Sequence, residues 1–191
     1  MKKLEKALER GKAFHDLVYP IFERYFDSEY ILVDIGAGNG CCGLFWQNFV
    51  HFVDKKKPNT FYDVLGIRPK TNFFYHESDF ADFDTKSLEG KKAFVGIHTC
   101  GNLSDLVINR SISERVPIAI IPCCHVSLKD YICDSSAQEL FSGNCSRYVD
   151  LIRQKKLLQN GFEVHYDTIA SMNTPKNRII VALPYRKIEL S

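Results

Sequence analysis

The segment 31–40, ILVDIGAGNG, constrains the fold more than any other part of the sequence. Its first half is apolar apart from Asp34 and predicts a buried strand. Gly36, Gly38 and Gly40 follow, and glycines permit positive φ angles and leave no side chain between the backbone and a ligand. A helix after such a turn presents free N–H groups and the positive end of its dipole. The segment therefore predicts a ligand-binding loop at the edge of a sheet.

Short apolar segments rich in Val, Ile, Phe and Tyr predict seven strands. They span residues 30–35, 62–67, 72–76, 93–98, 117–122, 162–168 and 178–184. Helical patterns over 43–53, 103–114 and 147–160 lie between several of them, and this alternation favours a mainly parallel sheet with helices on both faces. The connection 170–177 is too short for a crossover helix and predicts an antiparallel terminal hairpin. The expected class is α/β, Rossmann-like, with a seven-stranded sheet.

Residues 4–26 carry apolar side chains at helical spacing, which predicts one or two amphipathic helices interrupted near Gly11 and Pro20. We therefore expect an N-terminal helical extension over 1–28 and one domain over 29–191. The net charge of +2 indicates no global field for nucleic acid or membrane. Because no apolar run approaches the roughly 20 residues of a membrane span, and seven cysteines occur without a secretion signal, we expect a cytoplasmic protein with reduced thiols and no membrane partner.

The spacing Asp-x-Gly-x-Gly-x-Gly over 34–40 resembles motif I of class I S-adenosylmethionine-dependent methyltransferases, whereas nicotinamide-binding domains use Gly-x-Gly-x-x-Gly. That family also has seven strands and a terminal hairpin, so the resemblance covers most of residues 30–184. It implies that the cofactor is S-adenosylmethionine. It also implies that the methionine end lies against Asp34, Gly36, Gly38 and Gly40, with Ala37 in the same loop.

The end of the second predicted strand departs from the family's pattern. An Asp or Glu usually accepts hydrogen bonds from the ribose hydroxyls there, but the strand predicted over 62–67 runs into Arg68, which cannot accept them. Arg68 is a candidate cofactor-binding residue, and because it would suit the 2′-phosphate of a nicotinamide cofactor, a dehydrogenase stays open as an alternative. Otherwise the acid comes from elsewhere, or cofactor binding is weakened. Asp79 and Phe80, after the third strand, resemble the acid and apolar residue that hold the adenine; a loop acid or helix cap is the alternative for Asp79.

Three motifs are expected to meet at one edge of the sheet. Ligands of open α/β sheets bind at the carboxyl ends of the strands, near the point where the strand order reverses. GCCG over 40–43, HTCGNLSD over 98–105 and PCCH over 122–125 follow three strands that should be neighbours. This rim contains the candidate catalytic residues His98, Cys123 and His125 and the candidate substrate-binding residues Cys100, Asp105 and Cys124.

The second and third of these motifs also resemble a methyltransferase group in which His-x-Cys-Gly and a later Asp follow strand four and Cys-Cys follows strand five. That group includes tRNA 2′-O-methyltransferases. Together with the basic clusters at 55–57 and 153–156, this resemblance makes RNA the preferred acceptor. A small molecule or a protein side chain stays open as the acceptor.

Four interpretations of the cysteine and histidine residues compete. His98 or His125 could remove a proton from the acceptor, with Asp105 capping the next helix or orienting His98. Zinc is a second possibility, but adjacent thiolates rarely share one tetrahedral ion, and no metal is predicted. In a third, Cys123 or Cys100 attacks C6 of a pyrimidine. In the last, the thiols only pack tightly.

The sequence thus predicts an S-adenosylmethionine-dependent methyltransferase. The alternative is a non-catalytic binding protein that keeps the fold, for which Arg68 is the best support. The long connection 126–146 is a candidate lid or recognition loop over the acceptor side.

Overall fold

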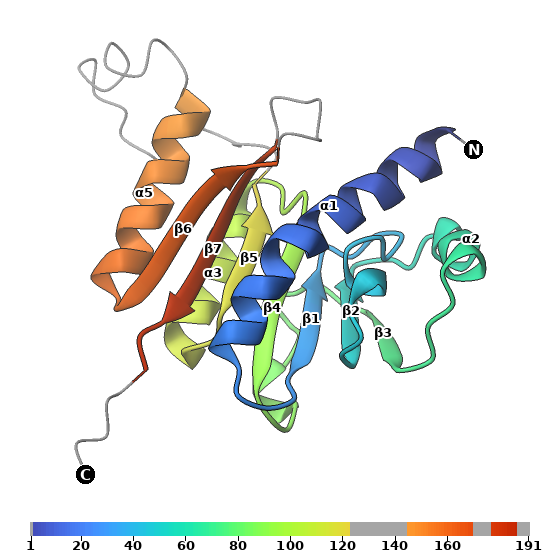
Figure 1. The fold of residues 1–191 in the computed structure, drawn as a ribbon, viewed down its shortest axis with the longest axis horizontal. Helices are drawn as coiled ribbons and strands as arrows, with labels where there is room; N and C mark the ends of the chain where they lie inside the picture. The colour runs from blue at the N-terminus through green and yellow to red at the C-terminus, as the bar shows by residue number, and fades with distance from the viewer. Residues whose placement is uncertain (1, 123–144, 170–176, 187–191) are drawn as a thin grey trace.

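The computed structural model of the chain is described over residues 2–122, 145–169 and 177–186. One sheet runs through it in the order β3-β2-β1-β4-β5-β7-β6 (Figure 1). The strands are β1 (Ile31–Ile35), β2 (Val50–Asp54), β3 (Phe73–Glu77), β4 (Lys92–Ile97), β5 (Ile118–Ile121), β6 (Phe162–Thr168) and β7 (Arg178–Pro184). The helices of the described residues are α1 (Lys2–Tyr25), α2 (Thr60–Ile67), α3 (Asn102–Glu114) and α5 (Cys145–Gln159), with 3-10 turns η1 (Gly43–Phe45) and η2 (Thr85–Ser87).

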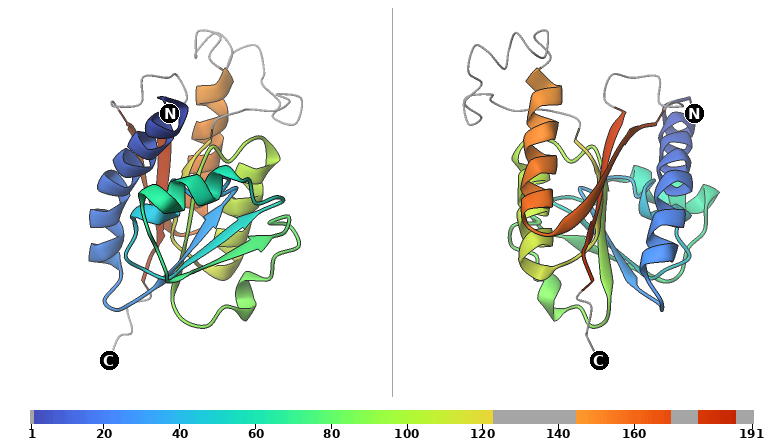
Figure 2. Two further views of the ribbon diagram at one scale, coloured as in Figure 1. Left: turned by 90° about the vertical axis from the view of Figure 1, so that its right-hand side faces the viewer. Right: turned by 60° about the vertical axis from the view of Figure 1, so that its left-hand side comes forward.

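Strands β1 to β5 pair in parallel, and β7 pairs antiparallel with both β5 and β6. The predicted α/β class, with a mainly parallel sheet, a terminal hairpin and an N-terminal helix, is confirmed. Neighbouring residues of β1 alternate between two apolar cores: Leu32 faces the core that includes α1, and Val33 faces the core that includes α3. Figure 2 shows these layers, with α1 and α2 on one face of the sheet and α3 and α5 on the other.

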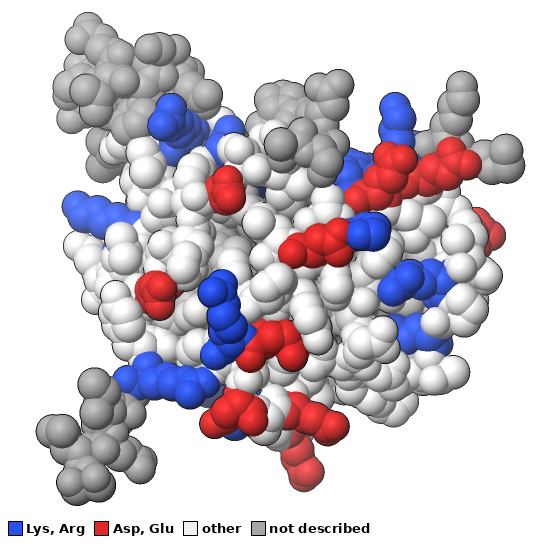
Figure 3. Space-filling model, in the orientation of Figure 1, with Lys and Arg blue, Asp and Glu red and all other residues white. Residues whose placement is uncertain are grey.

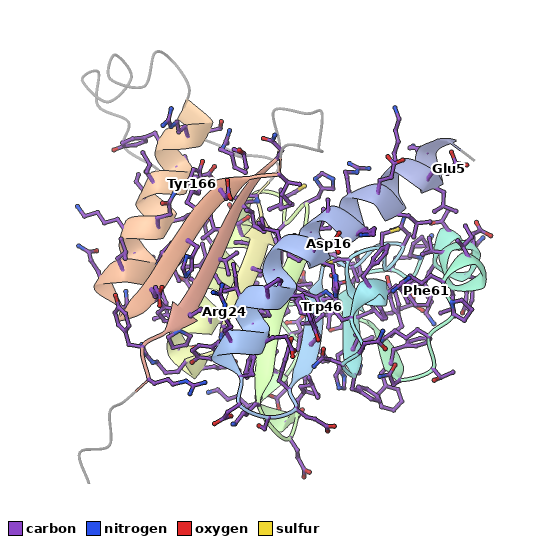
Figure 4. The ribbon with its side chains drawn as sticks, viewed as in Figure 1. Glu5, Asp16, Arg24, Trp46, Phe61 and Tyr166 are labelled. Carbon is purple, nitrogen blue, oxygen red and sulfur yellow. The ribbon has the colours of Figure 1, made fainter. Side chains whose placement is uncertain are left out.

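Helix α1 is continuous, although breaks were predicted near Gly11 and Pro20. Its residues Phe14, Val18 and Phe22 are fully buried, so packing on the sheet outweighs the low helix propensity of glycine and proline. The indole of Trp46 lies beneath the helix, whereas Glu5 and Asp16 extend away from it (Figure 4). None of the described helices, α1 included, combines the length and the apolar composition that crossing a bilayer requires.

Two segments adopt the opposite of the predicted structure. The helix predicted over 43–53 is replaced by η1 and then strand β2, and the strand predicted over 62–67 lies within helix α2. In β2, Val50 and Phe52 face one core while Val53 faces the other, which is the period of a strand. The other predicted strands are found within one residue at each end.

The burial pattern explains why residues 62–67 are helical. Phe61 and Val64 are buried, three positions apart, whereas Tyr62 and Ile67 are 59% and 61% exposed. An apolar run this short fits both periods, and only burial distinguishes an amphipathic helix from a strand. The true second strand therefore ends at Asp54, an acid, and not at Arg68.

A histidine pair joins β2 to the edge strand β3. His51 Nδ1 lies 2.9 Å from His76 Nε2, and the two rings stack beside the ring of Phe74. Burial, and then the charge of His76, lower the pKa of His51 to about 4. The folded protein consequently binds fewer protons than the unfolded chain between pH 6.5 and pH 4, and stability is lost as the pH falls through that window.

We expect the wild-type protein to lose about 1 kcal/mol of its free energy of unfolding through this pair between pH 7 and pH 5, allowing for screening at the sheet edge. His51→Gln should reduce that loss, because an amide does not titrate. Urea denaturation at the two pH values measures the difference. His165→Gln, on the more exposed ring of β6, is the control and should leave the loss unchanged. An equal loss of unfolding free energy in wild type and His51→Gln would show that His51 does not cause the pH dependence.

Candidate functional site

The sheet reverses its order between β1 and β4, and the candidate site lies at the carboxyl ends of these strands. Strand β1 pairs with β2 on one side and β4 on the other, and β4 pairs with β5. The expectation that the strands ending near Ile35, His98 and Pro122 are neighbours is confirmed. A cleft at such a reversal is where open α/β sheets bind ligands.

The glycine loop after β1 adopts the backbone that its sequence predicts. Gly36, Gly38 and Gly40 all have positive φ, at 66°, 51° and 77°. Gly40 also leaves no space for a side chain, since a Cβ there would lie 2.7 Å from the Phe61 ring. The loop therefore brings its main chain to the edge of the cleft without side chains in between.

Asp54, the last residue of β2, is the candidate site residue that the sequence interpretation missed. Its Oδ2 accepts a hydrogen bond of 2.8 Å from the N–H of Gly38, so the carboxylate is fixed against the glycine loop. It lies at the strand end where the resembled family has its ribose-binding acid. The alternation of apolar residues in VHFVD was the available signal, but those residues were assigned to a helix.

Arg68 is not at a strand end and does not line the cleft, so the structure does not support its assignment to the cofactor site. It lies just after α2, where its Nε donates to the Leu44 carbonyl at 2.8 Å and its guanidinium stacks on the Phe45 ring. Lys70 donates in the same way to the carbonyls of Trp46 and Asn48, at 2.8 and 2.9 Å. Arg68 thus satisfies a carbonyl of η1, and Lys70 satisfies two carbonyls of the segment between η1 and β2.

A cavity of about 700 Å³ opens beside Asp54. Phe80, Leu103 and Leu106 give it an apolar wall, and the remaining lining residues are Gly36, Val53, Asp54, Lys55, Ser78, Asp79, Ala81, Cys100, Gly101 and Asn102. Asp79 pairs with Lys55 at 2.8 Å, and this contact lowers the pKa of Asp79. Phe80 is 3% exposed and packs on Phe94. The predicted pair Asp79 and Phe80 thus lines the cavity.

A second cavity, of about 280 Å³, lies on the other side of the loop and shares Gly36 with the first. It is lined by α1 (Ala7, Arg10), by β1 and the glycine loop (Asp34, Gly36, Ala37, Gly38, Asn39, Cys41, Cys42) and by the end of β4 (Ile97, His98). Arg10 Nη1 lies 2.9 Å from His98 Nε2. The N-terminal helix therefore contributes a cation to the site, which the sequence did not indicate.

Asp34 is the acid of this second cavity and is 1% exposed. Its Oδ2 accepts a hydrogen bond of 2.8 Å from the N–H of Gly43, whereas its Oδ1 is buried without a hydrogen-bond partner. Burial raises the pKa of Asp34 to about 7. A buried acid with an unused oxygen is suited to a ligand that brings a hydrogen-bond donor.

No protein-family model and no curated protein matches the sequence. Solved structures do match the fold. An rRNA methylase from Streptococcus thermophilus has a TM-score of 0.54 at 16% identity, over 85% of this chain and 91% of that chain. Magnesium protoporphyrin IX methyltransferase from Synechocystis PCC 6803, with bound SAH, has a TM-score of 0.55 at 14% identity, over 92% of this chain and 83% of that chain. The 23S rRNA methyltransferase ErmE has a TM-score of 0.53 at 13% identity, over 90% of this chain and 68% of that chain. The chain has the fold of these methyltransferases.

Asp105, in the first turn of α3, is held by a buried arginine. Arg153 Nε and Nη2 donate to its two carboxylate oxygens at 2.9 and 2.8 Å. The Arg153 side chain is 3% exposed, so it ties α5 to α3 and is not a surface cation as its cluster suggested. Cys100 is disulfide-bonded, against the expectation of reduced thiols. Cys123, Cys124, His125 and most of the segment 126–146 lie outside the described residues.

Cys41 and Cys42 reach the rim as predicted, but as buried free thiols. Burial raises the pKa of Cys41 to about 11 and that of Cys42 well above its usual range. Both thiols are therefore protonated at neutral pH, and neither is suited to nucleophilic attack. Within 2–122, 145–169 and 177–186, no three His, Cys, Asp or Glu side chains are grouped to hold a metal ion.

Proposed function

We propose that the protein is an S-adenosylmethionine-dependent methyltransferase. The observation that carries the proposal is the pair of cavities that meet at Gly36, one with Asp54 and an apolar wall, the other with Arg10 and Asp34. S-adenosylmethionine is a nucleoside joined to an α-amino acid. Its ribose hydroxyls need a hydrogen-bond acceptor, and its amino-acid end needs a cation for the carboxylate and an acid for the ammonium group. The residues present fit both ends. When bound, it supplies an electrophilic methyl group.

The larger cavity would take the nucleoside. Asp54 offers carboxylate oxygens to the ribose hydroxyls, and its hydrogen bond from Gly38 orients it for that role. Phe80 and Leu103 provide an apolar surface for the adenine, and the Lys55–Asp79 pair lies beside them. A volume of about 700 Å³ falls in the range of ordinary small-molecule sites, roughly 300–1,000 Å³.

The smaller cavity would take the amino-acid end. The Arg10 guanidinium is a donor for a carboxylate, and the unused oxygen of Asp34 is an acceptor for an ammonium group. Gly36 and Gly38 line this cavity and allow the ligand to approach the main chain. This arrangement would direct the methyl group toward the ends of β4 and β5.

For the acceptor we keep RNA as the preferred class. The rRNA methylase from Streptococcus thermophilus and ErmE share the fold, and Lys55 is an exposed cation beside the cleft. On the face that carries α1, however, acidic and basic side chains are interspersed, with no field of one sign (Figure 3). His98 is proposed as the base that accepts a proton from the acceptor. Cys123 and His125 remain proposed catalytic residues, and Cys100, Asp105 and Cys124 remain proposed acceptor contacts.

The proposal is tested by isothermal titration of the protein with S-adenosylmethionine and, in parallel, with SAH, its demethylated product. We expect dissociation constants in the micromolar range, about −8 kcal/mol, followed by methyl transfer to an RNA pool. Absence of binding of either ligand at millimolar concentration would refute the cofactor assignment. The best support for the non-catalytic alternative was Arg68, which lies away from the cleft and no longer favours it.

A further inference from the structure

The contact between Arg10 and His98 fixes the protonation of the imidazole. A guanidinium only donates hydrogen bonds, so the 2.9 Å contact from Arg10 Nη1 requires an unprotonated Nε2 on His98. His98 is therefore neutral while the contact lasts, and its ring proton is on Nδ1. The lone pair that a general base would use at Nε2 is already engaged.

Both partners of this contact are held by rigid elements. Thr99, next to His98, donates its N–H to the Ile121 carbonyl at 3.2 Å and its hydroxyl lies 2.9 Å from that of Ser104. His98 itself has a φ of 66°, unusual for a residue other than glycine and typically retained where a site requires it. On the other side, Gly11 packs directly on the main chain at Cys41, which holds Arg10 over the cavity.

We propose that Arg10 is a positioning residue that occupies Nε2 of His98 until an anionic group in the smaller cavity takes over its guanidinium. The anion we assign is the carboxylate of the cofactor's amino-acid end, so this inference rests on the proposed function. Binding of the cofactor would then release the base, and the acceptor could be deprotonated only when the methyl donor is in place.

Transfer to a hydroxyl acceptor would need such a release. The acceptor would give its proton to Nε2 of His98, its oxygen would bond to the methyl carbon, and the methyl–sulfur bond would break with its electron pair left on sulfur. His98 becomes a cation in this step. A guanidinium hydrogen-bonded to Nε2 would block that proton, and the two like charges would repel. A carboxylate that draws Arg10 away removes both obstacles.

Nitrogen NMR of the protein labelled with ¹⁵N-histidine tests this proposal without any methyl acceptor. The His98 signals are identified by their loss in His98→Gln. In the free wild-type protein we expect Nε2 to be unprotonated and hydrogen-bonded. SAH should move the Nε2 signal to that of an unprotonated nitrogen without the Arg10 contact, whereas adenosine, which lacks the carboxylate, should not. Inorganic phosphate is added separately as a second source of an anion.

Two variants separate positioning from folding. In Arg10→Gln, the Nε2 chemical shift should already be that of a nitrogen without the Arg10 hydrogen bond, and adding SAH should not change it further. Lys12→Gln removes the same charge from an exposed position of the same helix and should behave as wild type.

The outcomes are distinct from those of the proposed function. If SAH binds by titration but leaves the Nε2 signal in place, the inference is wrong and the proposed function stands. If phosphate shifts the Nε2 signal as SAH does, the release is not specific to the cofactor and the inference is wrong. If Nε2 carries the proton in the free protein, Arg10 does not occupy it, and the inference is wrong as well. If SAH does not bind at all, the proposed function itself fails.

Discussion

Replacing Gly11 with alanine is expected to lower the free energy of unfolding by about 3 kcal/mol, at the upper end of overpacking substitutions. A Cβ at this position would lie 1.8 Å from the Cys41 carbonyl oxygen, and a carbonyl of the main chain cannot turn aside as a flexible side chain does. Helix α1 would have to move off the sheet, although Phe14, Val18 and Phe22 are fully buried beneath it. Urea denaturation at pH 7 measures the change.

Gly66→Ala is the matched control, because Gly66 lies in helix α2 and a Cβ there meets no atom within 4 Å. This variant should be neutral or gain about 0.5–1 kcal/mol from helix propensity.

Because Arg10 is adjacent to Gly11, we also expect Gly11→Ala to weaken SAH binding where the variant is still folded. Equal urea midpoints for Gly11→Ala and wild type would show that α1 does not approach Cys41 this closely.

Asp54→Asn is expected to weaken binding of S-adenosylmethionine about 30-fold. Hydrogen bonds to a charged group contribute about 1.5–3 kcal/mol, and the ribose hydroxyls would lose a carboxylate acceptor. The amide oxygen of asparagine can still accept from the Gly38 N–H, so the loop should keep its shape. The effect should therefore fall on affinity, measured by isothermal titration, and little on thermal stability.

Two comparisons make this result specific. Asp63→Asn removes the same charge from an exposed position in the first turn of α2 and should leave the affinity unchanged. Arg68→Ala should also leave it unchanged, since that side chain contacts Leu44 and Phe45 and not the cleft. A loss of affinity in Arg68→Ala as large as that in Asp54→Asn would restore Arg68 to the cofactor site.

The glycine loop and the rim were predictable because they depend on local chemistry and on strand order. Gly36, Gly38 and Gly40 adopt positive φ as their spacing suggests, and parallel strands bring the ends of β1, β4 and β5 together wherever their exact limits lie. The second strand was not predictable in the same way. The apolar run at 61–67 fits a helix and a strand equally well, and only the burial of Phe61 and Val64 in the folded protein selects the helix.

That single error placed the end of the second strand at Arg68 instead of Asp54, and it suggested that the acid proposed to contact the ribose was missing. Arg10 was beyond sequence reasoning for a different reason. It is one of many charges on an amphipathic helix, and its contact with His98 spans 88 positions of the chain. No local pattern specifies which charged residue of α1 faces the cleft, because that depends on how the helix is placed by Gly11.

The packing of α1 also bears on how the chain can fold during synthesis. This helix precedes every strand of the sheet in the sequence, yet Tyr25 Oη donates to the carbonyl of Pro184, the last residue of β7. Its apolar face packs on strands that leave the ribosome later, so the apolar residues of α1 stay exposed until β7 has also been synthesised. The N-terminal helix can therefore reach its final packing only after synthesis of the sheet is complete.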